Sequence, residues 1–243
     1  MHHCSKTRTA RRPIVVLLLS AAALLIGGCG SAPPRPPIPF KAIALVPVLS
    51  PAKLYTDNRM VPLPVLPVLI ASSIANRAKS AEFSRQMEKS RSEMGPQFTR
   101  MLLEELQARG FAVHVLEGIA RPPTDPEGID YATLPTQDAV LHVYFNDVSM
   151  ESSRLSSSYV PRVNIDVVFL PRGDRPDDGI SLDYRYGADA NGDDKSWSIP
   201  SDPKYRFPDF GALIARAGDV SESWQEAMRE MARRIARDLP RPE

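Results

Sequence analysis

A basic start followed by one short apolar run limits what the first part of this chain can be. Four basic residues and no acidic residue come before Cys29: Lys6, Arg8, Arg11 and Arg12. The apolar run over residues 14–26, about 13 residues long, matches the core of an export signal and is shorter than the roughly 20 residues that a membrane-spanning helix needs. We therefore expect residues 1–28 to be a signal peptide that takes no part in the fold.

The run ends in Leu-Ile-Gly-Gly-Cys at residues 25–29, and this ending resembles the lipobox of bacterial lipoproteins. The resemblance implies cleavage between Gly28 and Cys29 and a lipid, including palmitate-type acyl chains, on Cys29. Gly30 comes next, which in Gram-negative lipoproteins implies sorting to the outer membrane, facing the periplasm. Two alternatives stay open: a secreted protein with an incidental cysteine, and twin-arginine export through the arginine pair at residues 11–12.

A proline-rich segment separates the expected lipid from the rest of the chain. Five prolines occur between Ser31 and Pro39, and proline favours an extended polyproline conformation. At about 3.1 Å per residue, this tether would hold a folded domain roughly 30 Å from the membrane surface. We expect residues 29–39 to be the lipidated cysteine and its tether, and residues 40–243 to be a single globular domain.

Charge and cysteine content restrict the partners of the expected mature chain. Removal of residues 1–28 leaves 243 − 28 = 215 residues and takes away four basic side chains, so the formal charge becomes +1 − 4 = −3. The two charge signs are interspersed, which does not favour a nucleic-acid partner. Cys4 leaves with the signal and Cys29 carries lipid, so no disulfide can form within the mature chain.

The apolar pattern of residues 40–243 predicts an α/β fold with a mixed β-sheet of about five strands and helices packed on it. Buried runs and alternating runs both occur. The expected strands are residues 40–49, 111–115, 138–145, 163–169 and 180–186. The expected helices are residues 70–94, 98–109, 210–217 and 219–239, with a break at Gly95 and Pro96.

Local signals refine the last two helices. Asp209 is expected to cap the helix over 210–217, and Asp219 with Glu222 to form a capping box for the helix that follows. One apolar stripe of that last helix should close the core: Trp224, Met228, Met231, Ile235 and Leu239.

Residues 61–71 are strongly apolar but are interrupted by three prolines. A membrane-spanning helix is excluded by these prolines. The segment is interpreted as an irregular piece packed on the core, with a membrane-touching or subunit-contact segment as the alternative. The helix that follows is heavily charged and has a thin apolar stripe including Ile74, Ala78 and Ala81, so we expect much of it to be exposed or to meet a partner.

The order of elements over residues 40–145 resembles a group of envelope α/β domains. The resemblance is carried by the apolar strand from Ala42 to Val48, the sequence Leu-Gln-Ala-Arg-Gly-Phe-Ala-Val at residues 106–113, and Asp-Ala-Val-Leu at residues 138–141. The group includes the amino-terminal domain of the Tol-system periplasmic protein, the curli-secretion lipoprotein and the lipoproteins that activate penicillin-binding proteins. It implies a non-enzymatic envelope module and carries over no functional residue.

Motifs for catalysis or for metal and cofactor binding are missing from the sequence. There is no Gly-rich phosphate loop, no H-E-x-x-H, no G-x-S-x-G and no paired cysteine motif. His114 and His142 lie in expected strands and are interpreted as structural histidines, because a zinc site would need further nitrogen or sulfur ligands. We expect no cofactor and no metal.

Acidic loops offer two weaker possibilities. Residues 189–194 place Asp189, Asn191 and Asp193 at alternate positions like a calcium loop, but an acid stands where the turn glycine belongs, so a solvated turn is favoured. Two acidic pairs would be the carboxylates of an envelope polysaccharide hydrolase: Asp177 with Asp178, and Asp193 with Asp194. General acid catalysis needs a carboxyl in an apolar pocket, which a charged loop does not favour.

An aromatic and basic loop is the candidate contact site for a partner. Its residues are Trp197, Tyr205, Arg206 and Phe207, and the alternative is a loop folded over the core. Together these observations favour a non-catalytic, outer-membrane-anchored lipoprotein that binds or assembles with another envelope protein or with itself. The alternative functions are the polysaccharide hydrolase and a structural lipoprotein that only oligomerises.

Overall fold

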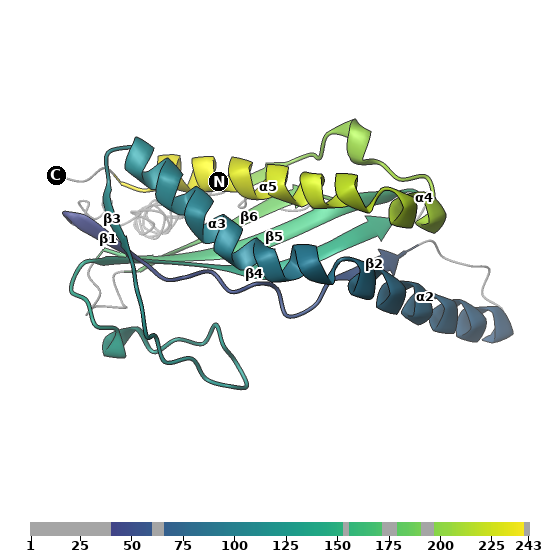
Figure 1. The fold of residues 1–243 in the computed structure, drawn as a ribbon, viewed down its shortest axis with the longest axis horizontal. Coiled ribbons are helices and arrows are strands. Elements are labelled where there is room, and N and C mark those ends of the chain that lie inside the picture. The colour runs from purple at the N-terminus through teal and green to yellow at the C-terminus, as the bar shows by residue number, and fades with distance from the viewer. Residues whose placement is uncertain (1–39, 60–65, 153–155, 172–178, 191–196, 241–243) are drawn as a thin grey trace, which may run out of the picture. The chain divides into compact units, whose positions relative to one another are not determined.

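Two long antiparallel strands, β4 (Ala139–Ser152) and β5 (Tyr159–Leu170), form the centre of the sheet (Figure 1). This computed structural model describes residues 40–59, 66–152, 156–171, 179–190 and 197–240. β6 (Ile180–Gly187) continues the antiparallel sheet beside β5. The predicted alternation holds in β5, where Val163, Ile165 and Val167 are buried in the main core. These central strands place one apolar face under the helices.

Four shorter strands complete a mixed sheet of seven strands. β1 (Ala42–Leu45) lies parallel between β3 (Ala112–Val115) and β4, and β7 (Trp197–Ile199) lies parallel to β6. β2 (Tyr55–Asn58) runs parallel to the far end of β4. The predicted α/β class is confirmed, but the expected number of strands is too low. β2 and β7 are short, so neither shows a measurable alternation in the sequence.

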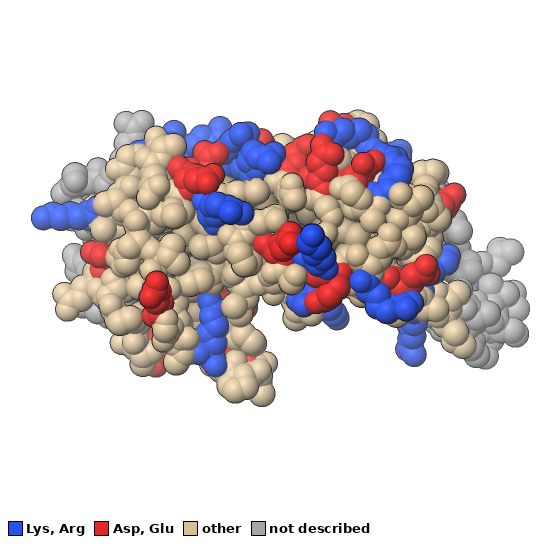
Figure 2. All heavy atoms as spheres, in the orientation of Figure 1, with Lys and Arg blue, Asp and Glu red and all other residues tan. Residues whose placement is uncertain are grey.

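Helices α3 (Glu88–Ala108) and α5 (Ala217–Asp238) pack on one face of the sheet, as Figure 1 shows. The predicted stripe is confirmed, because its four apolar side chains in α5, and Leu239 directly after the helix, are buried in the main core. Lys and Arg side chains are interspersed with Asp and Glu over this face (Figure 2). The amphipathic pattern of α5 therefore closes the core as expected.

Helix α3 continues through Gly95 and Pro96, so the predicted break there is wrong. The break lies at Met87, between α2 (Leu66–Gln86) and α3. Proline has no amide hydrogen to donate to the carbonyl of Ser92. The Ser50 hydroxyl donates to that carbonyl instead at 2.9 Å, and it accepts a hydrogen bond from the Gly95 amide at 3.1 Å. A side chain from outside the helix thus replaces the bond that proline cannot make.

The start of α2 corrects the interpretation of residues 61–71. The helix begins at Leu66, so the irregular path expected for this stretch is wrong from that point, while residues 60–65 lie outside the described part. Further along, Ile74 is 62% exposed, and Ala78 and Ala81 are also exposed. Among the α2 side chains that the structure describes, Phe83 is the buried one. Among the described residues, no helix has the length and hydropathy required to cross a membrane.

A second, smaller core covers part of the opposite face of the sheet. The proline-rich loop after β3 folds back there and includes a short 3-10 helix, η1 (Tyr131–Thr133). Its buried residues are Ala44, Val46, Leu116, Ile129, Leu134, Val140 and Leu170. The rest of that face carries polar side chains. Contacts group Ile38–Glu243 into one compact unit.

The predicted cap of helix α4 (Phe210–Ala215) is confirmed, because Asp209 Oδ1 accepts a hydrogen bond from the Ala212 amide at 2.8 Å. The capping box of α5 is wrong. The helix begins at Ala217, and Asp219 pairs with the Arg216 guanidinium at 2.6 Å.

We expect Asp209→Ala to lower the free energy of unfolding by about 1 kcal/mol, because the replacement leaves the amide at the start of α4 without an acceptor. Asp209→Asn keeps an acceptor oxygen and should cost only a few tenths of a kcal/mol by comparison. Urea unfolding of the two variants measures the difference. Equal losses from both replacements would show that the cap contributes nothing.

Candidate functional site

A cleft opens at the edge of β4, where the chain between β1 and β2 departs from the sheet. Its volume is about 170 Å³. We call it the β4 cleft and define it by its lining residues: Pro51, Ala52, Lys53, Tyr55, Phe145, Asn146, Asp147 and Val148. One wall is therefore the approach to β2, and the other is the middle of β4. A cleft with a few convergent polar groups is the usual form of a binding site.

A β-bulge in β4 shapes one wall of this cleft. Phe145 pairs with Ile165 and Asp147 pairs with Asn164, so Asn146 is an extra residue without a partner in the register. The Asn146 side chain donates to Asp166 Oδ2 at 3.0 Å. Bulges bend a strand and redirect its side chains, and they are frequent beside functional sites. Here the bulge turns the Asp147 carboxylate toward Tyr55.

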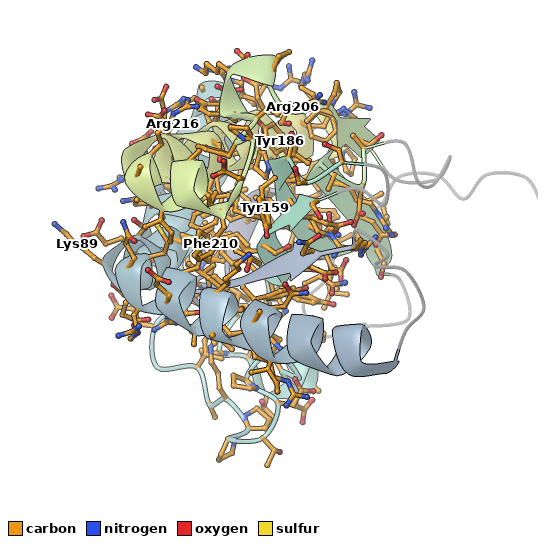
Figure 3. All side chains as sticks on the ribbon, turned by 90° about the vertical axis from the view of Figure 1, so that its right-hand side faces the viewer. Lys89, Tyr159, Tyr186, Arg206, Phe210 and Arg216 are labelled. Carbon is orange, nitrogen blue, oxygen red and sulfur yellow. The ribbon has the colours of Figure 1, made fainter. Side chains whose placement is uncertain are left out.

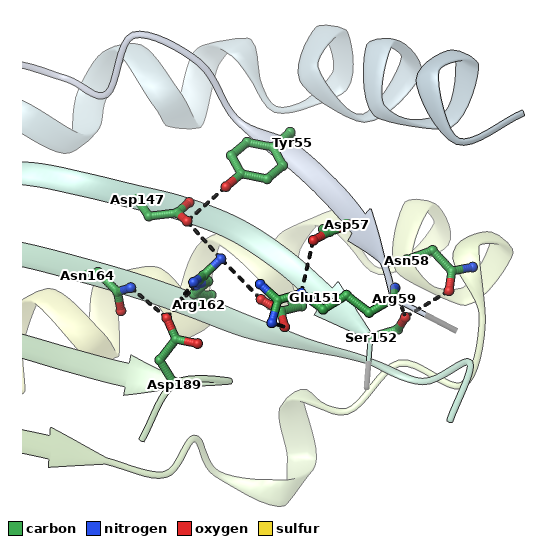
Figure 4. Close-up of polar contacts among 10 residues, drawn as sticks. All are labelled: Tyr55, Asp57, Asn58, Arg59, Asp147, Glu151, Ser152, Arg162, Asn164 and Asp189. Atoms are coloured by element: carbon green, nitrogen blue, oxygen red, sulfur yellow. Dashed lines mark hydrogen bonds and ion pairs between the residues drawn. The ribbon is translucent and has the colours of Figure 1, made fainter. Parts of the chain in front are cut away.

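Asp147 and Arg162 are the centre of a buried polar network on the face of the sheet opposite α3 and α5 (Figure 4). The Tyr55 hydroxyl donates to Asp147 Oδ2 at 2.8 Å, and Arg162 Nη1 lies 2.9 Å from the same oxygen. Arg162 Nη1 is also 3.2 Å from Glu151 Oε2. The Arg162 side chain is only 16% exposed. Buried charges of this kind are stable only when each has a partner.

Three further contacts extend the network along the sheet. Asp189, just after β6, accepts hydrogen bonds from Arg162 Nε at 2.6 Å and from Asn164 Nδ2 at 2.7 Å. At the other end, Arg59 Nη1 lies 2.7 Å from Glu151 Oε1. The Arg59 side chain is 42% exposed, so this pair lies at the margin of the network. The Arg162 guanidinium is thus the centre of a network that joins residues from β2, β4, β5 and the segment after β6.

Burial and charge shift the acid strength of three groups in this network. Burial raises the pKa of Tyr55 to about 12, and its hydrogen bond to Asp147 adds to the effect. Burial also raises the pKa of Glu151 above its ordinary value, although Arg162 and Arg59 oppose this. For Asp189, burial would raise the pKa, but the hydrogen bonds from Asn164 and Arg162 outweigh it and hold the pKa below its ordinary value.

The lowered pKa of Asp189 predicts a specific loss of stability in acid. The folded state binds this proton less readily than the unfolded state, so the stabilisation is present above the unfolded pKa and is lost as the pH falls through the folded pKa. Asp189→Asn should therefore be less stable near neutral pH, and its stability should fall less between about pH 5 and pH 2. Urea unfolding across this range tests the difference. The exposed Glu104→Gln should follow the unmodified chain, whereas parallel curves for Asp189→Asn and the unmodified chain would contradict the prediction.

The aromatic loop predicted to contact a partner is largely folded into the protein. Tyr205 is 1% exposed and Phe207 is 0% exposed, so the alternative of a loop folded over the core describes these two residues. Phe207 forms a bridge with Tyr159, with N to O distances of 2.9 and 2.7 Å. Trp197 is half-buried in β7, and Arg206 lies at the outside of this end of the domain (Figure 3). The four residues do not form a shared surface.

The two histidines have different environments. His142 is fully buried, with Nδ1 2.9 Å from the Tyr131 hydroxyl and Nε2 3.1 Å from Glu127 Oε2. Its interpretation as a satisfied structural histidine is confirmed. His114 lies exposed in the edge strand β3, 3.8 Å from Asp138 Oδ2. Within the described ranges, no group of three or more His, Cys, Asp or Glu residues could hold a metal ion.

The acidic loop residues fall mostly outside the described residues. Asp177 and Asp178 are not described, nor are Asn191, Asp193 and Asp194. Cys29, Gly28 and the whole tether are also outside. The first residue of the calcium-like sequence, Asp189, is described and belongs to the Arg162 network. The hydrolase and calcium interpretations therefore stay predictions.

Sequence reasoning missed the Arg162 network because it ended this strand at residue 145 and began the next one only at residue 163. Asp147, Ser149 and Glu151 lie at alternate positions of the extended strand. Arg162 and Asn164 lie at alternate positions of β5. Charged residues repeated at every second position near apolar ones were the available signal.

Comparisons with known proteins give little for this chain. No family model matches it, and no curated protein matches it. Among solved structures, one is described as a "putative neuraminyllactose-binding hemagglutinin homolog from Helicobacter pylori". It shares 14% sequence identity, and the match covers 87% of this chain and 93% of that chain with a TM-score of 0.30. A likeness at this level carries no conclusion about fold or function.

Proposed function

We propose that this chain is an outer-membrane lipoprotein, held by a lipid on Cys29, whose domain binds another envelope component through the β4 cleft. The single observation that carries the binding role is the Asp147 carboxylate in that cleft. Arg162 and Tyr55 both hold one of its oxygens, Oδ2, in place. Its position is therefore set before any partner arrives, which reduces the entropy cost of binding.

The described carboxylates support binding better than hydrolysis, because they are held in ion pairs. Asp147 and Glu151 both pair with Arg162, and Glu151 is only 7% exposed. A glycosidase needs one carboxyl that reaches the substrate as an acid and a second that acts as a base or nucleophile. Replacing each of the four loop aspartates at 177, 178, 193 and 194 with asparagine tests the alternative. Loss of a polysaccharide-cleaving activity in those variants would favour the hydrolase.

The lipid anchor predicts a complete change of location when Cys29 is replaced. Cys29→Ala removes the thiol that would carry the lipid, so the chain should lose incorporation of labelled palmitate and leave the outer-membrane fraction. Cys4→Ala is the matched control, because Cys4 lies in the expected signal peptide and should leave both properties unchanged. A Cys29→Ala chain that keeps label and location would contradict the anchor.

A photo-cross-linking residue placed in the β4 cleft tests the binding role in intact cells. At position 146, on the exposed bulge, we expect a discrete cross-linked product. At position 229, exposed on α5, the same residue should give no such product. A product with the mass of two chains would identify the partner as a second copy. No product at position 146, or the same product at both positions, would count against a binding site in the cleft.

A further inference from the structure

The middle of β4 has no strand partner among the described residues on the side away from β5. On that side β1 pairs with residues 139–141, and β2 pairs with residues 149–152. No described segment pairs with residues 142–148 there. This stretch of β4 is about 20 Å long at the usual rise of a strand. An open strand edge presents unpaired amide and carbonyl groups that pair readily with another extended chain.

Contacts with α3 hold the connecting chain away from this edge. The Val48 amide donates to Thr99 Oγ1 at 2.9 Å, and Arg91 Nη1 donates to the Pro51 carbonyl at 2.7 Å. The β4 cleft is the space that remains between residues 51–55 and the strand. Its volume of about 170 Å³ is below the roughly 300–1,000 Å³ of small-molecule sites. It suits one side chain and a short stretch of main chain.

The unpaired oxygen of Asp147 and the charge of the polar network beside the cleft favour a donor or a cation in the occupant. Among the described residues, no group donates a hydrogen bond to the buried oxygen Oδ1 of Asp147. An ionised carboxylate only accepts hydrogen bonds, and a buried acceptor without a donor is costly. The network around it has two arginines and four acids, so its formal charge is 2 − 4 = −2: Arg59, Arg162, Asp57, Asp147, Glu151 and Asp189.

Lys53 is the one cation among the residues that line the cleft. It is exposed, and its Nζ lies 5.4 Å from the centre of the Tyr55 ring. No hydrogen bond or ion pair joins it to Asp147 in the described structure. It is therefore an exposed positive charge in the cleft, and it would repel a basic group of an occupant that approaches Asp147.

We infer that the β4 cleft binds an extended peptide segment of a partner protein, which pairs with the open edge of β4 and places a lysine or arginine side chain against Asp147. This inference rests on the proposed binding function and names the class of partner. Main-chain pairing supplies affinity in such strand additions, and side-chain pockets supply specificity. Asp147 is the specificity determinant.

Labelled synthetic peptides test both parts of the inference on the full chain purified in detergent. The probes are the blocked pentapeptides Thr-Val-Lys-Val-Thr and Thr-Val-Glu-Val-Thr, and a lysine peptide with methylated main-chain amides. By fluorescence anisotropy, we expect the lysine peptide to bind roughly tenfold more tightly than the glutamate peptide. We expect the methylated peptide not to bind, because it cannot pair with a strand. Equal binding of the methylated peptide, no preference for lysine, or no saturable binding would each overturn the inference.

Two variants locate the interaction. Asp147→Asn keeps an oxygen for Tyr55 and Arg162 but removes the charge, so the preference for lysine should disappear. Lys53→Ala changes an exposed side chain and should bind the lysine peptide several-fold more tightly. This variant tests the inference if Asp147→Asn fails to fold. An unchanged lysine preference in a folded Asp147→Asn, or unchanged affinity in Lys53→Ala, would overturn the inference. If the chain gives a specific cross-link at position 146 but binds neither peptide, the proposed function stands and this inference fails.

Discussion

Replacing Arg162 with methionine is expected to lower the free energy of unfolding by about 3–5 kcal/mol, or to prevent folding. Arg162 pairs with Asp147, Glu151 and Asp189, and among the described residues no other side chain forms ion pairs with all three. Methionine fills much of the same volume but leaves Asp147 and Asp189 without the cation that pairs with them, and Glu151 with Arg59 alone. The cost arises from uncompensated buried charge, since the loss of side-chain volume is small.

Arg59→Met is the matched control for Arg162→Met. Arg59 contacts Glu151 and Asp57 in the same network, but its side chain is 42% exposed. Water screens an exposed pair, so we expect a loss of under about 1 kcal/mol. Urea unfolding monitored by circular dichroism gives both values. If the two variants lose similar and small amounts, Arg162 does not stabilise the network.

Gly95→Ala is expected to lower the free energy of unfolding by about 3 kcal/mol. A Cβ atom at this position would lie 2.5 Å from the Ser50 amide nitrogen and 2.5 Å from the Val48 carbonyl oxygen. Both are main-chain atoms, so α3 and the segment after β1 would have to move apart. That movement would also disturb the Ser50 contacts that bridge the helix at Pro96.

Gly218→Ala provides the control for this packing effect. Gly218 lies in α5, and a Cβ atom there would have no neighbour within 4 Å. Alanine has the higher helix propensity, so the replacement should be neutral or stabilise by up to about 1 kcal/mol. Thermal unfolding of both variants makes the comparison. A neutral Gly95→Ala would mean that the close approach of α3 to the β1–β2 connection is not rigid.

The elements predicted correctly are those with a long and regular pattern. The stripe of α5, the alternation in β5 and the cap at Asp209 each depend on residues close in sequence, where helix or strand geometry alone sets the side-chain direction. The break at Gly95 and Pro96 was predicted from the same kind of local rule. It was wrong because Ser50, distant in sequence, satisfies the Ser92 carbonyl.

The candidate site was not predictable in the same way. Tyr55, Asp147, Arg162 and Asp189 come from four separate segments, and each is an ordinary polar residue in its own segment. Their meeting depends on the pairing of β2 with β4 and on the bulge at Asn146. The aromatic loop shows the converse. Its composition suggested a contact surface, but Phe207 pairs with Tyr159, and both Tyr205 and Phe207 are buried.

The sequence by itself determined the α/β class, the apolar faces of the main elements and the expectation of a lipid on Cys29, because these depend on composition, periodicity and a contiguous motif. The tertiary structure alone decided where β4 ends, which carboxylates share the Arg162 guanidinium, and that no described strand pairs with β4 beside Asp147. These features depend on strand register and on contacts between distant segments. A shift of one residue in register turns every later side chain of a strand to the other face, and the bulge at Asn146 introduces such a shift within β4.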